Sequence, residues 1–136
     1  MFLATDLDGT FLGGDAESRT ALYRLVTRDP DITLVFVTGR GLESVLPLLA
    51  DPTLPTPDYL ICDVGATVVE GEDLQPVQPL QAGIDTRWRG EQTVAEAFLH
   101  VAGLQRQEIP QERRCSYYCT ADAVTPDIHV LAAELA

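Results

Sequence analysis

The chain has 136 residues, the usual length of one domain, and its 46% hydrophobic and 22% charged residues are typical of a globular rather than a disordered protein. No stretch approaches the roughly 18 uncharged apolar residues of a membrane span. The net charge of −12 comes from 21 acidic and nine basic residues, all nine of them arginines, and it disfavours binding to nucleic acids and to anionic membranes.

The first half of the chain predicts alternating strands and helices. An apolar run at residues 2–7 predicts a buried strand that ends at an Asp-Gly turn. Apolar side chains at i, i+3 and i+4 predict an amphipathic helix over 17–28, which Asp29-Pro30 ends. Further strands are predicted at 32–37, 59–62 and 67–70, with a helix at about 42–50 between the first two of these.

This order of elements predicts an α/β fold with a Rossmann-like parallel sheet. Unbroken apolar strands between helices are typical of parallel sheets that are covered on both faces. Binding sites in such sheets lie beyond the carboxyl ends of the strands. The candidate motifs of this sequence directly follow the predicted strands, and we therefore expect them to meet at one edge of the sheet.

The sequence pattern changes after about residue 75. It predicts a helix at 91–103, an alternating strand at 114–120 and a short helix at 125–136. This part is too short for an independent domain. We interpret it as the start of a second module.

The three cysteines, Cys62, Cys115 and Cys119, do not suggest a disulfide framework. Cys115 and Cys119 stand about 13 Å apart on one predicted strand, whereas bridged Cα atoms lie about 4.4–6.8 Å apart. No further ligands stand at zinc-binding spacings. We interpret the cysteines as structural thiols of a protein from the reducing cytoplasm. An N-terminus without the basic region of a signal peptide agrees with that location.

The sharpest motif is Asp6-Leu7-Asp8-Gly9-Thr10 at the end of the first predicted strand. Side chains at i and i+2 of a strand point to the same side, so the two carboxylates can face one pocket. Such a pair suits Mg²⁺, or one carboxylate that attacks a substrate while the other moves protons. The alternatives are an exposed acidic turn and a calcium loop, for which Gly9 comes too early.

A second motif, Thr38-Gly39-Arg40, follows the second predicted strand. A hydroxyl, a flexible residue and a following helix N-terminus suit an anion such as phosphate. An ordinary turn from strand to helix is the simpler interpretation. A third is a dinucleotide site, because Gly39-x-Gly41-x-x-Ser44 partly matches its fingerprint and Asp63 lies near the ribose-binding distance. The third glycine of that fingerprint is missing.

Together the two motifs resemble the haloacid dehalogenase-like superfamily of phosphatases and phosphotransferases. Asp6–Thr10 matches the first motif of that superfamily in full, and Thr38 matches the second. The segments TDLDGT, FVTGR and PDYLICDVGA are most similar to its sucrose-phosphate phosphatase branch, and RRCSYYC resembles a strand of that branch's cap domain. The resemblance implies the first half of such an enzyme, with a partial core at 1–78 and an incomplete α/β cap at 79–136.

The resemblance also implies roles for individual residues. Asp6 would attack the phosphorus and form an aspartyl-phosphate, and Asp8 would protonate the leaving sugar oxygen and then activate water. Mg²⁺ would bridge Asp6, the main-chain carbonyl of Asp8 and the phosphate. Thr38, Gly39 and Arg40 would hold the phosphate. The expected substrate is a sugar phosphate, with sucrose 6-phosphate as the leading candidate.

Two elements of the superfamily are absent from the sequence. The third motif supplies a lysine or arginine, and none of the arginines of this chain occupies the equivalent context. The fourth motif, an acidic pair that completes the Mg²⁺ shell, is also missing, which would weaken metal affinity and charge stabilisation. The alternatives are therefore a non-catalytic domain that binds a sugar phosphate or regulates a partner and, more weakly, a dinucleotide-binding oxidoreductase.

Overall fold

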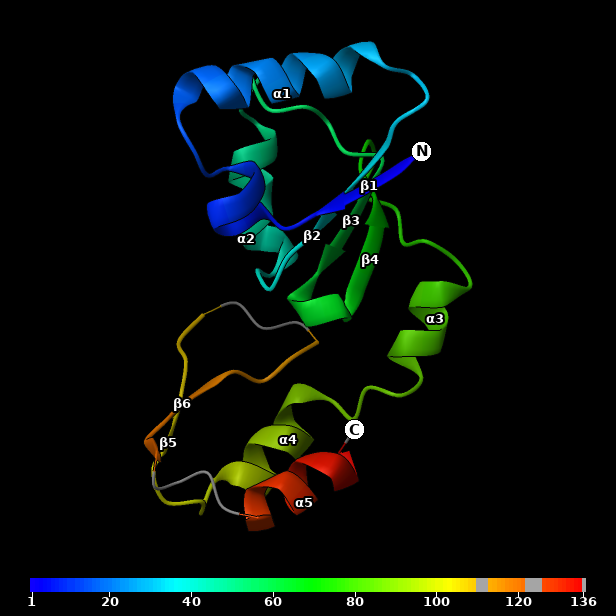
Figure 1. Cartoon of the computed structure of the whole chain (residues 1–136). Coiled ribbons are helices and arrows are strands. Elements are labelled where there is room, and N and C mark those ends of the chain that lie inside the picture. Colours follow the sequence, from blue (N-terminus) through cyan, green and yellow to red (C-terminus); the bar gives the residue numbers. More distant parts are fainter. Residues whose placement is uncertain (110–112, 122–125, 136) are drawn as a thin grey trace.

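The computed structural model describes residues 1–109, 113–121 and 126–135, and its strands form two separate sheets (Figure 1). The four-stranded sheet contains β1 (Phe2–Thr5), β2 (Thr33–Val37), β3 (Tyr59–Cys62) and β4 (Thr67–Glu70). Its helices are α1 (Ala16–Arg28), α2 (Leu42–Leu49) and α3 (Leu80–Asp85). The C-terminal elements are α4 (Glu91–Phe98), β5 (Leu104–Arg106), β6 (Tyr117–Cys119) and α5 (Pro126–Leu135).

The strands of the larger sheet lie in the order β1-β2-β3-β4. β1, β2 and β3 are parallel, as the alternation of strands and helices predicts, and β4 is antiparallel to β3. The reason for the antiparallel pair is the connection, because the segment 63–66 is far too short to carry the chain back to the start of a parallel strand. The predicted α/β fold with a parallel core is thus confirmed.

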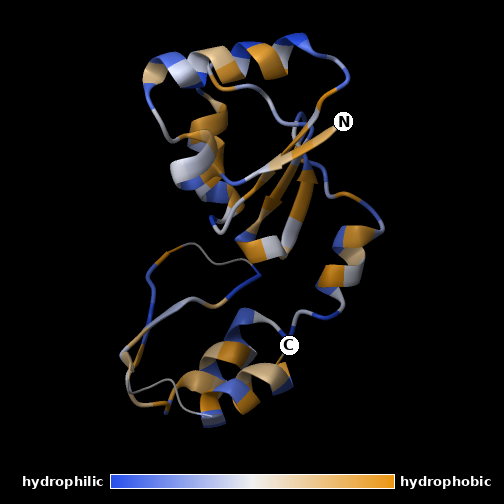
Figure 2. Ribbon diagram, in the orientation of Figure 1, coloured by the Kyte–Doolittle hydropathy of each residue, from blue (hydrophilic) through white to orange (hydrophobic). Residues whose placement is uncertain are grey.

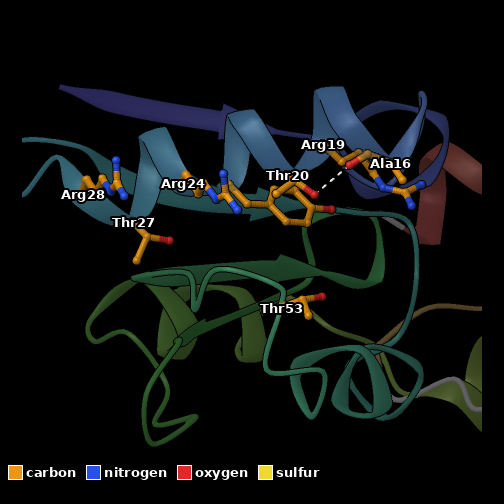
Figure 3. A pocket seen from close by; sticks show the side chains of 8 residues that line it. Ala16, Arg19, Thr20, Arg24, Thr27, Arg28 and Thr53 are labelled. Atoms are coloured by element: carbon orange, nitrogen blue, oxygen red, sulfur yellow. Dashed lines mark hydrogen bonds between the residues drawn. The ribbon is translucent and has the colours of Figure 1, made fainter.

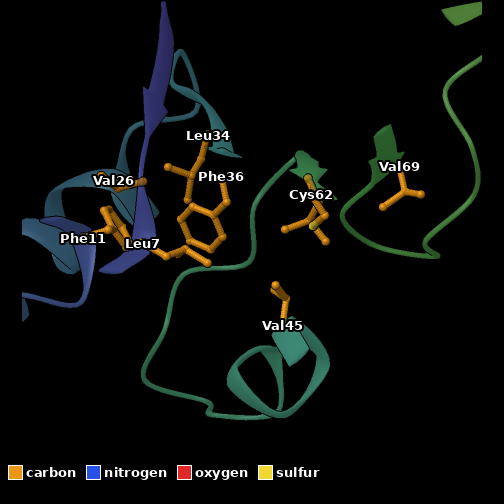
Figure 4. Close-up of a cluster of buried hydrophobic side chains, with 9 residues drawn as sticks. Leu7, Phe11, Val26, Leu34, Phe36, Val45, Cys62 and Val69 are labelled. Atoms are coloured by element: carbon orange, nitrogen blue, oxygen red, sulfur yellow. The ribbon is translucent and has the colours of Figure 1, made fainter. Parts of the chain in front are cut away.

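One face of this sheet carries the hydrophobic core. Side chains alternate along each strand, so Leu34 and Phe36 of β2 share this face with Leu60 of β3. Helices α1 and α2 cover it, because both crossovers between parallel strands return over the same side (Figure 1). The buried members of the cluster, most of them labelled in Figure 4, are Leu7, Phe11, Val26, Leu34, Phe36, Val45, Leu60, Cys62 and Val69.

The opposite face of the sheet is only partly covered in the described part of the chain. Phe2 is 77% exposed there, and Val37 and Tyr59 are 37% and 36% exposed. The expectation that both faces are covered is therefore wrong for these residues. Helix α3 lies along the outer edge of β4 instead, where Oε1 of Gln81 accepts a hydrogen bond from the N–H of Val68 (2.7 Å). Figure 2 shows the apolar colouring of these strands.

The C-terminal elements lie together beyond the end of the sheet at which β1, β2 and β3 finish (Figure 1). Helix α4 ends at Phe98, whereas the sequence predicts a helix that continues to residue 103. The next element is β5, which pairs with β6 in an antiparallel ladder. Gly103, between α4 and β5, has a φ of +79°, which turns the chain out of a helix. Helix α5 matches the prediction at 125–136, whose two end residues lie outside the described ranges.

Two further features of the described residues complete the fold. None of the helices in these ranges is both long and apolar enough to cross a membrane. All three cysteines are free thiols, and Cys62 is fully buried in the core. Burial raises the pKa of the Cys62 thiol to about 11, so this group stays protonated at neutral pH. The division of the chain at residues 78 and 79 stays a prediction.

Candidate active site

Asp6 and Asp8 follow β1 and stand on either side of Leu7, at the start of a turn that the N–H groups of Phe11 and Leu12 close by donating to the carbonyls of Asp6 and Leu7. Leu7 is fully buried, whereas both carboxylates are exposed. Both acidic side chains are therefore accessible to solvent, and that they face one pocket stays a prediction. Gly9 has a φ of +73°, a left-handed conformation that glycine adopts without strain, and it returns the chain toward the core.

The second motif, Thr38–Arg40, forms a tight loop after β2, which we call the β2 loop. Thr38 is 4% exposed, and its N–H donates to the carbonyl of Ile61 (2.8 Å), which extends the pairing of β2 with β3. The Thr38 hydroxyl accepts a hydrogen bond from the N–H of Arg40 (3.2 Å). Gly39 is exposed, and α2 begins shortly after it. The β2 loop thus stands at a helix N-terminus, where an anion is favoured.

Arg40 joins the two motifs through an ion pair with Asp8. Its Nε donates to Oδ2 of Asp8 (2.8 Å) and its Nη2 to Oδ1 (2.5 Å), so the contact is bidentate. This contact lowers the pKa of Asp8 and raises the pKa of Arg40. The two side chains are 54% and 37% exposed, and solvent therefore screens their attraction. Asp6 accepts a longer hydrogen bond at Oδ2 from the hydroxyl of Thr10 (3.4 Å).

Asp63, which directly follows β3, also contacts the β2 loop. Its N–H donates to the carbonyl of Arg40 (2.8 Å), and its Oδ2 accepts a hydrogen bond from the hydroxyl of Thr67 (2.8 Å). The side chain is 1% exposed. The carboxylate is therefore closed off from a ribose hydroxyl, which argues against the dinucleotide interpretation. Asp63 is not among the residues that the sequence motifs assign to the phosphate site, although its position directly after a buried strand indicates a place at this edge of the sheet.

Arg114, which precedes β6, also reaches the β2 loop. Its Nη1 donates to the carbonyl of Gly39, and its Nε lies 3.3 Å from Oδ1 of Asp63. No arginine stands in the sequence context of the missing basic residue, and the structure places Arg114 at the edge of the site. The available signal was the pair of arginines in RRCSYYC. The other, Arg113, donates from Nε to Oδ1 of Asp85 (2.7 Å).

Oxygen ligands for a hard cation are available at the end of β1. The carboxylate of Asp6 is exposed and carries one long hydrogen bond, whereas that of Asp8 is bound by Arg40. Within the described ranges, no group of three or more His, Cys, Asp or Glu side chains could hold a metal ion. Mg²⁺ is usually held by one or two carboxylates together with water and substrate phosphate. The carboxylate of Asp6 and the main-chain carbonyl of Asp8 therefore fit the protein's share of such a shell.

A groove of about 410 Å³ lies on α1, apart from the residues described above (Figure 3). Two arginines four residues apart on the helix, Arg24 and Arg28, point along it, and threonine hydroxyls add to its polar lining. None of the candidate site residues lines the groove. The groove is therefore separate from the carboxylates and from the β2 loop. The lining residues are Ala16, Arg19, Thr20, Tyr23, Arg24, Thr27, Arg28 and Thr53.

Comparison with protein sequences gives one family and several relatives. The family model for sucrose-6F-phosphate phosphohydrolase matches residues 1–136. The glucosylglycerol-phosphate synthase of Pseudomonas anguilliseptica is 56% identical over 136 residues, which are 99% of this chain and 18% of the relative. The mannosylfructose-phosphate phosphatase of Agrobacterium fabrum is 33% identical over 112 residues, which are 78% of this chain and 43% of that protein. The chain thus spans less than half the length of these relatives.

Comparison with solved structures gives the same fold. The sucrose-phosphatase of Synechocystis sp., solved with sucrose and phosphate, superposes with a TM-score of 0.74 at 24% identity. A haloacid dehalogenase-like hydrolase from Bacillus subtilis superposes with a TM-score of 0.60 at 16% identity. The matched regions cover 99% and 98% of this chain, and 55% of each of the two solved chains.

Proposed function

Since the chain belongs to the sucrose-6F-phosphate phosphohydrolase family, we propose that the ends of β1 and β2 form a phosphatase site for a sugar phosphate. The observation that supports this most is the ion pair of Asp8 with Arg40, because it joins the acidic motif to the β2 loop across 32 residues of sequence. The carboxylates and the candidate phosphate-binding groups therefore share one small region.

The proposed reaction has two steps. In the first, a carboxylate oxygen of Asp6 attacks the phosphorus, the bond from phosphorus to the sugar oxygen breaks, and Asp8 donates a proton to that oxygen. In the second, water attacks the aspartyl-phosphate while Asp8 takes up a proton, which releases phosphate and restores Asp6. The β2 loop would hold the phosphoryl oxygens with its amides and with Thr38 and Arg40.

Mg²⁺ is the metal that suits this oxygen donor set. Asp6 and the main-chain carbonyl of Asp8 would hold it, and when bound it would offset the negative charge of the phosphoryl group. Arg40 would then leave Asp8 and turn to the phosphate. Its ion pair with Asp8 opposes the protonation that the first step requires, because a nearby cation favours the charged carboxylate.

The proposed substrate is the phosphate ester of a glycoside. The relative with 56% identity is named for glucosylglycerol phosphate, and a second relative is named for mannosylfructose phosphate. The family is named for sucrose 6-phosphate. All three are phosphate esters in which a sugar is joined to another polyhydroxyl unit. The higher identity favours glucosylglycerol phosphate as the first compound to test, and sucrose 6-phosphate as the second.

A second candidate is a domain that binds the same esters without cleaving them. Two observations favour it: Arg40 occupies both carboxylate oxygens of Asp8, and the described residues lack a third acidic group beside Asp6 and Asp8. Such a domain would bind a glycoside phosphate and return it unchanged.

The test is phosphate release from the three esters by the purified chain, with and without Mg²⁺. We expect Mg²⁺-dependent release that Asp6→Asn abolishes. The matched control is Asp31→Asn. Asp31 lies just before β2, at the end of the strand away from the site, so this variant removes the same charge and should keep full activity. Binding of an ester in calorimetry without release would favour the binding domain, and neither binding nor release would contradict both candidates.

A further inference from the structure

Arg114 and Asp63 form a buried ion pair between the C-terminal elements and the end of the sheet. Their side chains are 15% and 1% exposed, and Nε of Arg114 lies 3.3 Å from Oδ1 of Asp63. Neither of these two atoms has a hydrogen-bond partner among the described residues. Burying a charge without compensation is costly. The ion pair therefore helps to offset the burial of both groups, together with the hydrogen bonds from Thr67 to Oδ2 of Asp63 and from Nη1 of Arg114 to Gly39.

Both members of this ion pair also touch the β2 loop. Asp63 donates its N–H to the carbonyl of Arg40 (2.8 Å), and Arg114 donates from Nη1 to the carbonyl of Gly39. Two successive carbonyl groups of the loop are thus held, one by each partner. These two contacts fix the main chain of the loop at Gly39 and Arg40, beside the N-terminus of α2, where an anion is favoured.

The backbone at Asp63 needs such support. Asp63 and Val64 have φ values of +53° and +59°, in the left-handed region that few residues other than glycine adopt. Aspartate is tolerated there, whereas a β-branched valine is an outlier. Conformations of this kind persist only where the surroundings fix them, and they are concentrated at functional sites. Here the surroundings are Thr67, which bonds Oδ2 of Asp63, and Arg114 at Oδ1.

We propose that Arg114 is a positioning residue of the phosphate site. It fixes the β2 loop directly through Gly39 and indirectly through Asp63, so the loop is ordered for an anion when the segment before β6 is docked on the sheet end. This inference rests on the proposed function, because it assigns a role in binding the phosphoryl group. It adds a residue from outside the two motifs, 75 positions along the chain from Gly39.

The experiment compares Arg114→Met, Arg114→Lys and Arg106→Met in the full chain. The control residue Arg106 pairs with Glu91 inside the C-terminal elements, so its loss removes an arginine without touching the β2 loop. The first measurement is the affinity for inorganic phosphate in the presence of Mg²⁺, by calorimetry. We expect about tenfold weaker binding for Arg114→Met, partial recovery for Arg114→Lys and no change for Arg106→Met.

The second measurement is amide hydrogen exchange, which needs no ligand. We expect the N–H of Asp63 to exchange about tenfold faster in Arg114→Met, and the amide signals of Gly39 and Arg40 to shift, while Arg106→Met leaves all three unchanged. Asp63→Asn gives an independent route if Arg114→Met does not fold. It keeps the size of the side chain, asparagine tolerates a positive φ, and it should weaken phosphate binding in the same direction.

The two measurements separate the inference from the proposed function. If the wild-type chain binds no phosphate, the proposed phosphate site fails, and exchange alone decides whether Arg114 orders the loop. If Arg114→Met folds and both phosphate affinity and exchange at Asp63 stay at wild-type values, the inference is overturned. Equal effects of Arg114→Met and Arg106→Met would also overturn it, because they would reduce Arg114 to a general structural contact.

Discussion

The guanidinium of Arg40 donates a hydrogen bond to each oxygen of the Asp8 carboxylate, from Nε to Oδ2 (2.8 Å) and from Nη2 to Oδ1 (2.5 Å). These residues come from the ends of two adjacent parallel strands. In the proposed reaction Asp8 must carry a proton, and Arg40 favours the charged carboxylate. The proposed reaction therefore requires Arg40 to leave Asp8 before the proton is transferred.

The first prediction concerns the pKa of Asp8. Replacing Arg40 by methionine should raise it toward the ordinary aspartate value of about 3.9, because the hydrogen bonds that favour the charged form are lost. A lowered pKa in the folded state stabilises the protein at neutral pH, and this contribution disappears as the pH falls through that pKa. Titration of the Asp8 carboxyl carbon by NMR measures the change.

Arg24→Met is the control for this titration, because it removes the same charge from α1 and leaves the contact with Asp8 in place. It should not change the pKa of Asp8. An unchanged pKa in Arg40→Met would show that the ion pair is not populated in solution.

The second prediction compares two phenylalanines on neighbouring strands. Phe36 is fully buried, with its ring centroid 5.0 Å from that of Phe11, whereas Phe2 is 77% exposed. Phe36→Ala should lower the free energy of unfolding by about 3–5 kcal/mol, a large part of the roughly 5–15 kcal/mol of a typical domain. Phe2→Ala should change it by less than about 0.5 kcal/mol. Urea unfolding curves measure both, and equal losses would place the core elsewhere.

The third prediction concerns Gly71, which lies against the main chain of the loop before β3. A Cβ atom there would overlap the carbonyl oxygen of Pro57. Gly71→Ala should therefore destabilise the protein by about 1–3 kcal/mol. Gly83 in α3 is the matched control, because a Cβ there meets nothing within 4 Å. Gly83→Ala should raise stability by about 0.5–1 kcal/mol in thermal unfolding, and a harmless Gly71→Ala would contradict the close packing.

The fourth prediction concerns thiol reactivity. Cys119 is exposed, whereas Cys62 is fully buried and has its pKa raised to about 11 by burial. Because the thiolate is the reactive form, iodoacetamide at pH 7.5 should modify Cys119 first and Cys62 only on unfolding. Peptide mass spectrometry at successive times gives the order. Modification of Cys62 in the native protein at the rate of Cys119 would mean that the core opens readily.

The elements that the sequence predicts best are those with strong local signals. The strands β2 and β3 are apolar runs of β-branched and aromatic residues, and α1 has a clear helical period with an aspartate-proline stop. The short elements α3 and β5 have three to six residues, and so few residues carry little periodicity. The partial covering of the second face of the sheet depends on the paths of the crossovers, which local patterns do not specify.

The same distinction applies to the candidate site. Two motifs at strand ends predict that Asp6, Asp8 and the β2 loop lie at one edge, because parallel strands finish together, and the structure places them there. Which side chains bind one another depends on rotamers and on loops that are distant in sequence. The pairing of Arg40 with Asp8 and the arrival of Arg114 at Asp63 are contacts of that kind.

β1 is an edge strand of the sheet, which makes the protein concentration important when activity is measured. On the side away from β2, its main-chain N–H and C=O groups have no partner strand among the described residues, and an exposed strand margin can pair with another chain. Exposed Phe2 adds apolar surface to the same strand. Self-association would then run through the strand that directly precedes Asp6, and it would bury the site as the protein concentration rises. If self-association buries the site, phosphate release per molecule should fall as the protein concentration rises. An inactive site would release no phosphate at any concentration.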